Sequence, residues 1–219
     1  KNRVCFLALG PAYNIIDIGI NEDARGGDGQ AAATLLMPGA TAHITARNPL
    51  WQKSLLDVFV NLGRGTLASA NGADGTIIEQ PTRALQVRAR LNAMLLDTPR
   101  FELGPSLGLD IQRNRYFSED TDITSGLPGL HARVPLSRVL LEANIAPSLG
   151  VVNWGDRNTI LGYSADFGAT IHLARGFILR AGVRNMYHGS DNIRSETLLV
   201  EGPLTHQTFT TAFNIGWSN

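Results

Sequence analysis

The sequence predicts an all-β protein, an antiparallel up-and-down transmembrane β-barrel of about ten strands, with eight strands as the alternative. Three observations support this prediction: apolar residues repeat with a period of two, the repeating segments are long, and their connections alternate in length. The clearest segment is TILGYSADFGATIHLA, residues 159–174, in which Tyr163, Phe167 and Ile171 alternate with small or polar residues. Successive side chains of a strand point to opposite faces, so this period indicates β structure.

The lengths of the segments favour membrane strands over soluble ones. Soluble strands usually have about 5–6 residues, whereas a tilted membrane strand needs about 9–11. In chain order the candidate strands are 3–17, 33–47, 55–67, 84–96, 101–117, 130–136, 139–153, 159–174, 177–189 and 208–219. The count falls to eight if the poorly alternating first segment or the short 130–136 segment does not span.

The connections between these segments alternate between short and long. The short connections are 48–54, 96–100, 135–138 and 172–176. The long connections are 20–30, 69–83, 117–129 and 188–196, with 154–158 a shorter member of this group. This rhythm is typical of an up-and-down barrel with tight turns at one end and loops at the other, and an even strand number puts both termini at the turn end.

The chemistry of the two strand faces decides which one is inside. One face is bulky and apolar, and the other combines glycine and serine with charged residues. The charged residues of that second face are Asp57, Arg88, Arg90, Glu102, Asp110, Glu142, Asp166, Arg180 and Arg184. Glycine on the exposed face of a soluble strand would weaken it and cover nothing, whereas a narrow lumen accommodates small residues and paired charges. The polar face is therefore predicted to line the lumen, with the apolar face against lipid.

Composition bounds the remaining classes. The 219 residues show no linker or low-complexity tract, so residues 1–219 are predicted to form a single domain. The net charge of zero gives no reason to expect a nucleic-acid partner. Cys5 is the only cysteine, which excludes an intrachain disulfide and a cysteine metal cluster. We expect no cofactor and no metal site, because the acidic stretch SEDTD and the scattered histidines lack a ligand pattern.

With its alternating strands and its C-terminal stretch TFTTAFNIGW, the chain resembles a small bacterial outer-membrane β-barrel of the broad OmpA/OmpX/OmpW-like class. This resemblance implies a location in the bacterial outer membrane. It also implies outer-membrane lipid and lipopolysaccharide as surroundings, and the barrel-assembly machinery as a partner during biogenesis. In that class a terminal strand with alternating aromatic residues resembles the signal that the machinery reads.

One constellation suggests enzymatic chemistry. His188 and Ser190 loosely resemble the His-x-Ser element of outer-membrane lipid A deacylases of the PagL type, which would make Ser190 the nucleophile, His188 the base and Glu201 the orienting acid. However, His188 shares the predicted inner face of its strand with Arg180 and Arg184, away from the lipid that such an enzyme must reach. We therefore expect His188 to be an ordinary strand residue next to a polar loop, and we expect that the protein is not an enzyme.

The inner face predicts a network of paired charges instead. Taking residues 174–176 as the turn, Arg184 should lie opposite Asp166 on the preceding strand. The other expected members of the network are Arg180, Glu142, Arg88, Arg90, Glu102 and Asp110. The leading hypothesis is thus a non-enzymatic barrel with a narrow or plugged lumen, acting as a structural, anchoring or interaction module. The alternatives are a small-solute pore, a lipid A hydrolase that uses His188 and Ser190, and a soluble ligand-binding barrel.

Overall fold

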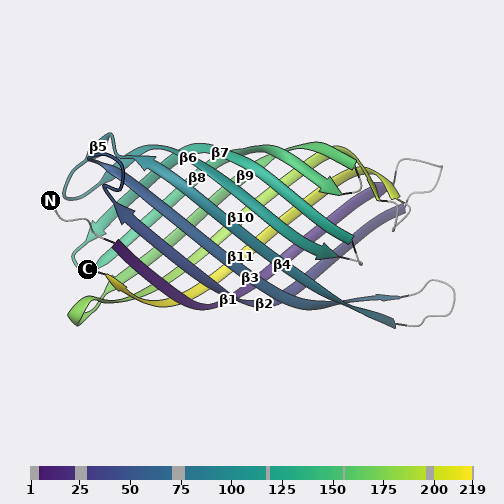
Figure 1. The fold of residues 1–219 in the computed structure, drawn as a ribbon, viewed down its shortest axis with the longest axis horizontal. Coiled ribbons are helices and arrows are strands. Elements are labelled where there is room, and N and C mark those ends of the chain that lie inside the picture. Colours follow the sequence, from purple (N-terminus) through teal and green to yellow (C-terminus); the bar gives the residue numbers. More distant parts are fainter. Residues whose placement is uncertain are drawn as a thin grey trace.

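The structure is a closed antiparallel β-barrel with ten long strands (Figure 1). The computed structural model describes residues 5–22, 29–70, 77–116, 119–154, 156–195 and 200–218. The elements are β1 (Cys5–Glu22), β2 (Gly29–Arg47), β3 (Ser54–Ala70), β4 (Ile77–Ala93), β5 (Leu96–Asp97), β6 (Glu102–Tyr116), β7 (Glu119–Leu136), β8 (Val139–Trp154), β9 (Asp156–His172), the 3-10 turn η1 (Ala174–Gly176), β10 (Phe177–Ser195) and β11 (Val200–Ser218). The all-β prediction and the count of ten strands are confirmed, and β5 is a two-residue addition beside β6.

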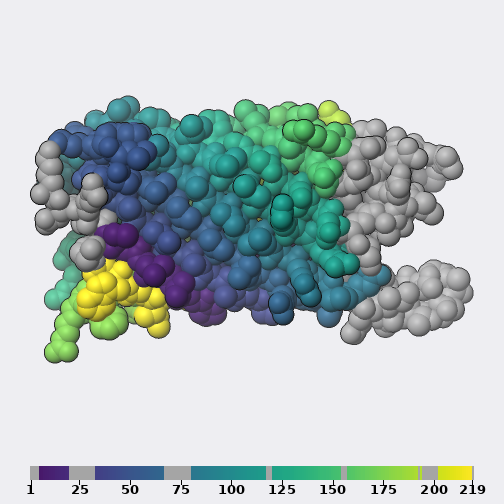
Figure 2. Space-filling model, in the orientation of Figure 1, coloured from purple at the N-terminus to yellow at the C-terminus, as the bar shows by residue number. Residues whose placement is uncertain are grey.

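Each long strand pairs with the long strands that precede and follow it in the chain, and one further ladder, between β1 and β11, closes the ring. The β4–β6 ladder spans the short connection that contains β5, and the β1–β11 ladder joins the two ends of the chain. β1 begins and β11 ends at the end of the barrel that carries the short connections, as predicted (Figure 1). In the space-filling view the first and last strands lie side by side on the surface of an elongated cylinder (Figure 2).

The predicted facing of the strands is confirmed. Large apolar side chains on the outer face are exposed, with Leu107 and Phe213 each at 66%. Of the charged positions that were assigned to the lumen, Arg180 and Arg184 are partly buried and the others are buried, including Arg88 and Asp110 at 0%. The polar inner face and the apolar outer face fit a barrel that is surrounded by lipid. No helix among the described residues is long and apolar enough to cross a membrane.

Several strands extend further than the sequence pattern predicted. The stretch 117–129 was expected to be a long loop, but β7 begins at Glu119 and residues 119–136 form one strand. Likewise, residues 77–83 belong to β4 and residues 188–195 to β10. A 19-residue strand at about 3.3 Å per residue and about 40° tilt rises roughly 48 Å, which is about twice the apolar band of a membrane barrel.

The two halves of these long strands differ in chemistry. We call the half next to the short connections the turn half and the opposite half the loop half. On β6, outward Leu107 and Leu109 in the turn half give way to exposed Arg113 and Arg115 in the loop half, while inward Tyr116 is fully buried. The lumen of the loop half holds an apolar cluster of Ile16, Ile18, Leu35, Met37, Tyr116, Ile123, Val152, Ile160, Ile193 and Leu204. The loop half is therefore built like a soluble barrel, with an apolar interior and a polar exterior.

Candidate functional site

The lumen of the turn half contains two groups of ion pairs, and Asp166 is at the centre of the first. The register of β9 and β10 places Arg184 directly opposite Asp166, and Arg184 Nε lies 2.8 Å from Asp166 Oδ1. Two arginines from β4 reach the same carboxylate, with Arg88 Nη1 at 2.8 Å and Arg90 Nη1 at 2.7 Å. Arg88 Nε also lies 2.6 Å from Asp110 Oδ2 on β6. The structure thus contains the expected Asp166–Arg184 pair. It also shows that Asp166 forms ion pairs with Arg88 and Arg90 from across the lumen.

The strand order shows how far these pairs reach. Arg88 and Arg90 belong to β4 and Asp166 belongs to β9, which lies four steps away around the ten-strand ring in one direction and six in the other, so the two strands lie on facing walls. Alternation along each strand directs Arg88 and Arg90 inward from one wall, and Asp166 and Arg184 inward from the other. Ion pairs between opposite walls fill the cross-section of the lumen with side chains.

A second group of ion pairs lies nearer the short turns. Arg180 is paired with Glu142, and Arg133 connects Glu142 (3.0 Å) with Glu102 (3.1 Å). Arg47 then extends the chain of pairs from Glu102 (2.5 Å) to Asp97 (2.9 Å). All the expected network residues therefore have ionic partners, in two groups instead of one.

Sequence reasoning missed several members of the second group. Arg133 lies two residues after inward His131, and Arg47 follows the inward series Thr41, His43 and Thr45. Extending strict alternation to the ends of these two strands would have identified both arginines. The pair between His43 Nε2 and Asp57 Oδ2, at 2.5 Å, was also missed, because a histidine gives no sign of charge in the sequence.

The lumen groups balance in charge. The acidic members are Asp57, Asp97, Glu102, Asp110, Glu142 and Asp166. The arginines are Arg47, Arg88, Arg90, Arg133, Arg180 and Arg184. Equal numbers of opposite charges give the lumen no net sign with which to select an ion. Because a buried charge is costly without a partner, this arrangement is suited to holding the walls together.

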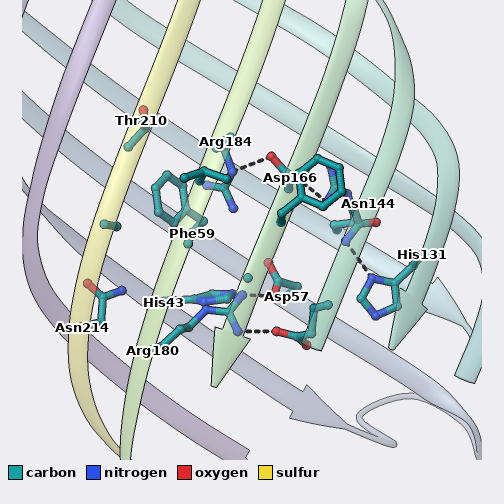
Figure 3. A pocket seen from close by; sticks show the side chains of 17 residues that line it. His43, Asp57, Phe59, His131, Asn144, Asp166, Arg180, Arg184, Thr210 and Asn214 are labelled. Atoms are coloured by element: carbon teal, nitrogen blue, oxygen red, sulfur yellow. Dashed lines mark hydrogen bonds and ion pairs between the residues drawn. The ribbon is translucent and has the colours of Figure 1, made fainter. Parts of the chain in front are cut away.

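A small cavity separates the two groups of ion pairs (Figure 3). Around it, Arg184 is directed at Asp166, and His43 is directed at Asp57. The Arg184 guanidinium also stacks on the Phe59 ring, 3.5 Å from the ring centroid. The cavity has a volume of about 40 Å³. Since one water needs about 10–15 Å³ by this measure, it has the size of about three waters and cannot hold a nutrient-sized solute.

Histidines and hydroxyl groups form a polar layer between the ion pairs and the apolar cluster. His188 Nε2 lies 2.9 Å from Ser148 Oγ, and His206 Nε2 lies 3.3 Å from the Tyr116 hydroxyl. Ser190 is buried on the same inner face as His188, whose described hydrogen bond goes to Ser148. The side chain of Glu201 lies outside the described residues, as does that of Glu119 in the SEDTD stretch. The described residues contain no group of three or more metal-binding side chains.

Comparisons with known proteins agree with the architecture. No family model matches the sequence, and no curated protein is similar to it. Among solved structures, the outer membrane protease OmpT from Escherichia coli superposes with a TM-score of 0.60 at 12% identity, over 100% of this chain and 97% of that one. OprG from Pseudomonas aeruginosa has a TM-score of 0.42 at 9% identity, over 100% and 97% of the two chains. At these identities the likeness concerns the fold alone, and that fold is the bacterial outer-membrane β-barrel.

Proposed function

We propose that this protein is a non-enzymatic outer-membrane barrel with a closed lumen, which serves as a structural, anchoring or interaction module. One observation carries the proposal: side chains fill the lumen at three successive levels. Ion pairs occupy the turn half, histidines and hydroxyl groups lie in the middle, and the apolar cluster occupies the loop half. Placement in the outer membrane is supported by the fold and by the apolar outer face of the turn half.

The closed lumen argues against the small-solute pore. Water-filled porins usually have about 16–18 strands, and a ring of ten is narrow enough for side chains to fill. The ion pairs and the apolar cluster lie one after the other along the lumen. A solute that crosses the barrel would therefore have to displace the ion pairs and also the apolar cluster. A variant that loses the ion pairs should keep the apolar cluster, and a variant that loses the apolar cluster should keep the ion pairs.

Planar-bilayer conductance tests this proposal. We expect no stable single-channel current from the wild-type protein, from the Asp166→Ala/Arg184→Ala variant, or from the Leu35→Ala/Ile123→Ala variant. Only the combination of all four substitutions should give a current, because it weakens the ionic and the apolar barriers together. Heat-modifiable migration in a gel would show that each variant is folded. A large, steady conductance of the wild-type protein would contradict the proposal and favour a pore.

Burial also argues against a hydrolase. His188 is fully buried, Ser190 is 7% exposed, and both point into the lumen instead of toward lipid. A hydrolase acting on lipid A would need the nucleophile and the base within reach of an acyl ester. The direct test is mass spectrometry of lipid A from cells that express the wild-type protein or Ser190→Ala. Identical lipid A in both cultures is expected, and loss of an acyl chain in the wild-type culture alone would establish the enzyme.

The proposed partners follow from the same placement. The terminal strand β11 carries outward Phe209, Phe213 and Trp217 at every fourth position, which supports recognition by the barrel-assembly machinery. Outer-membrane lipid and lipopolysaccharide are the proposed surroundings of the exposed apolar face.

A further inference from the structure

The rim of the barrel at its turn end carries one exposed cation in every short connection. These residues are Lys53 between β2 and β3, Arg100 between β4 and β6, Arg138 between β7 and β8, and Arg175 between β9 and β10. We call this set the cationic rim. No carboxylate of the described residues forms an ion pair with any of its members. Asp97, the carboxylate within these connections, is already paired with Arg47.

The distribution of the four cations around the ring is even. At the turn end of the barrel, the ten strands form five adjacent pairs, and short connections join four of these pairs. The fifth pair is β1 and β11, whose ladder closes the ring and is called the β1–β11 seam. A cation therefore stands at four of the five positions of the perimeter. A protein partner would contact one side of such a rim, whereas lipid surrounds all of it.

Large apolar side chains lie within two residues of each of these cations. Trp51, Phe101, Leu136, Phe177 and Trp217 are exposed at the turn ends of their strands. Phe177 and Trp217 pack edge to face, with ring centroids 4.9 Å apart. Aromatic side chains favour the headgroup level of a membrane, so this girdle puts the rim cations at the depth of the lipid phosphates.

Two of the cations occupy backbone positions that favour glycine. Lys53 has φ 66° and Arg175 has φ 62°, in the left-handed region that residues other than glycine and asparagine rarely adopt. Hydrogen bonds hold both turns: Met94 N donates to the Lys53 carbonyl at 2.8 Å, and Leu173 N donates to the Phe177 carbonyl at 2.7 Å. A long charged side chain in such a position costs stability that glycine would not, which points to a use for the charge.

The loop half provides the contrast. Its exposed charges on the outer face are mixed in sign, as in the pairs Arg113–Asp122 and Arg115–Asp120. Within the described residues, the turn rim differs from the loop half because its four exposed cations are not paired with acids.

We propose that the cationic rim binds the phosphate groups of anionic phospholipids in the leaflet at the turn end, so that the barrel selects these lipids for its surrounding shell. This inference rests on the proposed placement of the barrel in a membrane. It adds a lipid class and a position on the protein to that placement.

The two tryptophans of the rim provide a direct readout. The full chain with Trp154→Phe keeps Trp51 and Trp217 as reporters, because β8 carries Trp154 at its loop end. The protein is folded into vesicles of phosphatidylcholine that contain either brominated phosphatidylglycerol or brominated phosphatidylcholine. Bromine quenches tryptophan at short range, so the two mixtures give the relative occupancy of lipid sites at the rim.

We expect phosphatidylglycerol to be preferred roughly fivefold, which is about the factor that one lysine or arginine contributes near an anionic lipid surface. The preference should fall to about one in the Lys53→Gln/Arg100→Gln/Arg138→Gln/Arg175→Gln variant. A matched control changes four exposed arginines of the loop half, with Arg64→Gln, Arg83→Gln, Arg113→Gln and Arg157→Gln, and it should keep the preference. Both variants lose the same charge.

Equal quenching by the two brominated lipids in the wild-type rim would overturn the inference. An unchanged preference in the rim variant would overturn it as well. Loss of the preference in 50 mM inorganic phosphate, but not in chloride of the same ionic strength, would reveal isolated phosphate sites instead of a lipid shell. Absence of quenching by either lipid would instead refute the membrane placement, so the two proposals fail in distinguishable ways.

Discussion

The turn half and the loop half of the barrel share the same strands, but they have opposite chemistry. In the turn half, β10 directs Arg180 and Arg184 inward and Leu179 and Val183 outward. In the loop half, the same strand buries Ile193 and exposes Asp191. The change occurs close to the outward Tyr163–Tyr187 stack, whose ring centroids lie 5.7 Å apart. The solvent around each half explains the difference, because lipid takes apolar side chains and water takes polar ones.

The same comparison shows what holds each half together. The inner face of the turn half carries mainly charged groups, beside a small apolar cluster of Phe6, Ala8 and Ile178, so paired charges connect most of its walls. The loop half gains from the hydrophobic effect in the ordinary way, through the cluster around Leu35 and Ile123. A given kind of substitution should therefore lower the free energy of unfolding strongly in one half of the barrel and only slightly in the other half.

The largest effect is expected for Arg88→Leu in the turn half. This change leaves Asp110 without its described ionic partner and removes one of three arginines from Asp166. Breaking a buried ion pair costs about 3–5 kcal/mol in the free energy of unfolding. Urea unfolding in detergent micelles would measure it. The control is Arg115→Leu, since the exposed Arg115–Asp120 pair, at 4.0 Å, should contribute less than about 1 kcal/mol. Equal costs for the two variants would contradict the view that ion pairs hold the turn half.

A slightly smaller effect is expected for Leu35→Ala in the loop half. Leu35 is 1% exposed within the apolar cluster, and removing its side chain leaves a cavity. The expected loss is about 2–5 kcal/mol in the same unfolding experiment. Leu36→Ala is the matched control, because the adjacent residue faces outward and is 54% exposed. If Leu36→Ala were the more damaging change, the loop half would have no core of its own.

The third prediction compares one substitution on the two outer faces. Phe167→Arg places a charge on the lipid-facing side of the turn half, where the cost is roughly 2–4 kcal/mol at the midplane of a membrane. Thr159→Arg places the same charge on the same strand in the loop half, where we expect about 0–0.5 kcal/mol. Unfolding from lipid vesicles provides the measurement. A neutral Phe167→Arg would show that the turn half does not face lipid.

The sequence predicted the turn half well, because membrane strands have a regular polar-in, apolar-out pattern. The Asp166–Arg184 register followed from that pattern and one turn position. The loop half was taken for long connections, since the pattern inverts there and the stretch 119–129 reads as polar with isolated apolar residues such as Ile123 and Leu127. Two arginines of the second group of ion pairs were missed for a related reason, although Glu102, Glu142 and Arg180 of that group were predicted. Arg47 and Arg133 lie at strand ends, where alternation has few positions left to establish the face.

The β1–β11 seam has a consequence for how the ring closes. Nine of the ten ladders that close the ring join strands that are neighbours in the chain, such as Leu136 opposite Val139 across a short turn. The seam instead pairs Phe6 with Ser218 at the two ends of the chain. Because loop-closure entropy grows with the logarithm of the chain length enclosed, this single ladder costs about 3–4 kcal/mol more to form than a hairpin does. A circular permutation that joined the two ends and opened the chain at Ser137 would keep every ladder, but it would move this long-range closure to β7 and β8.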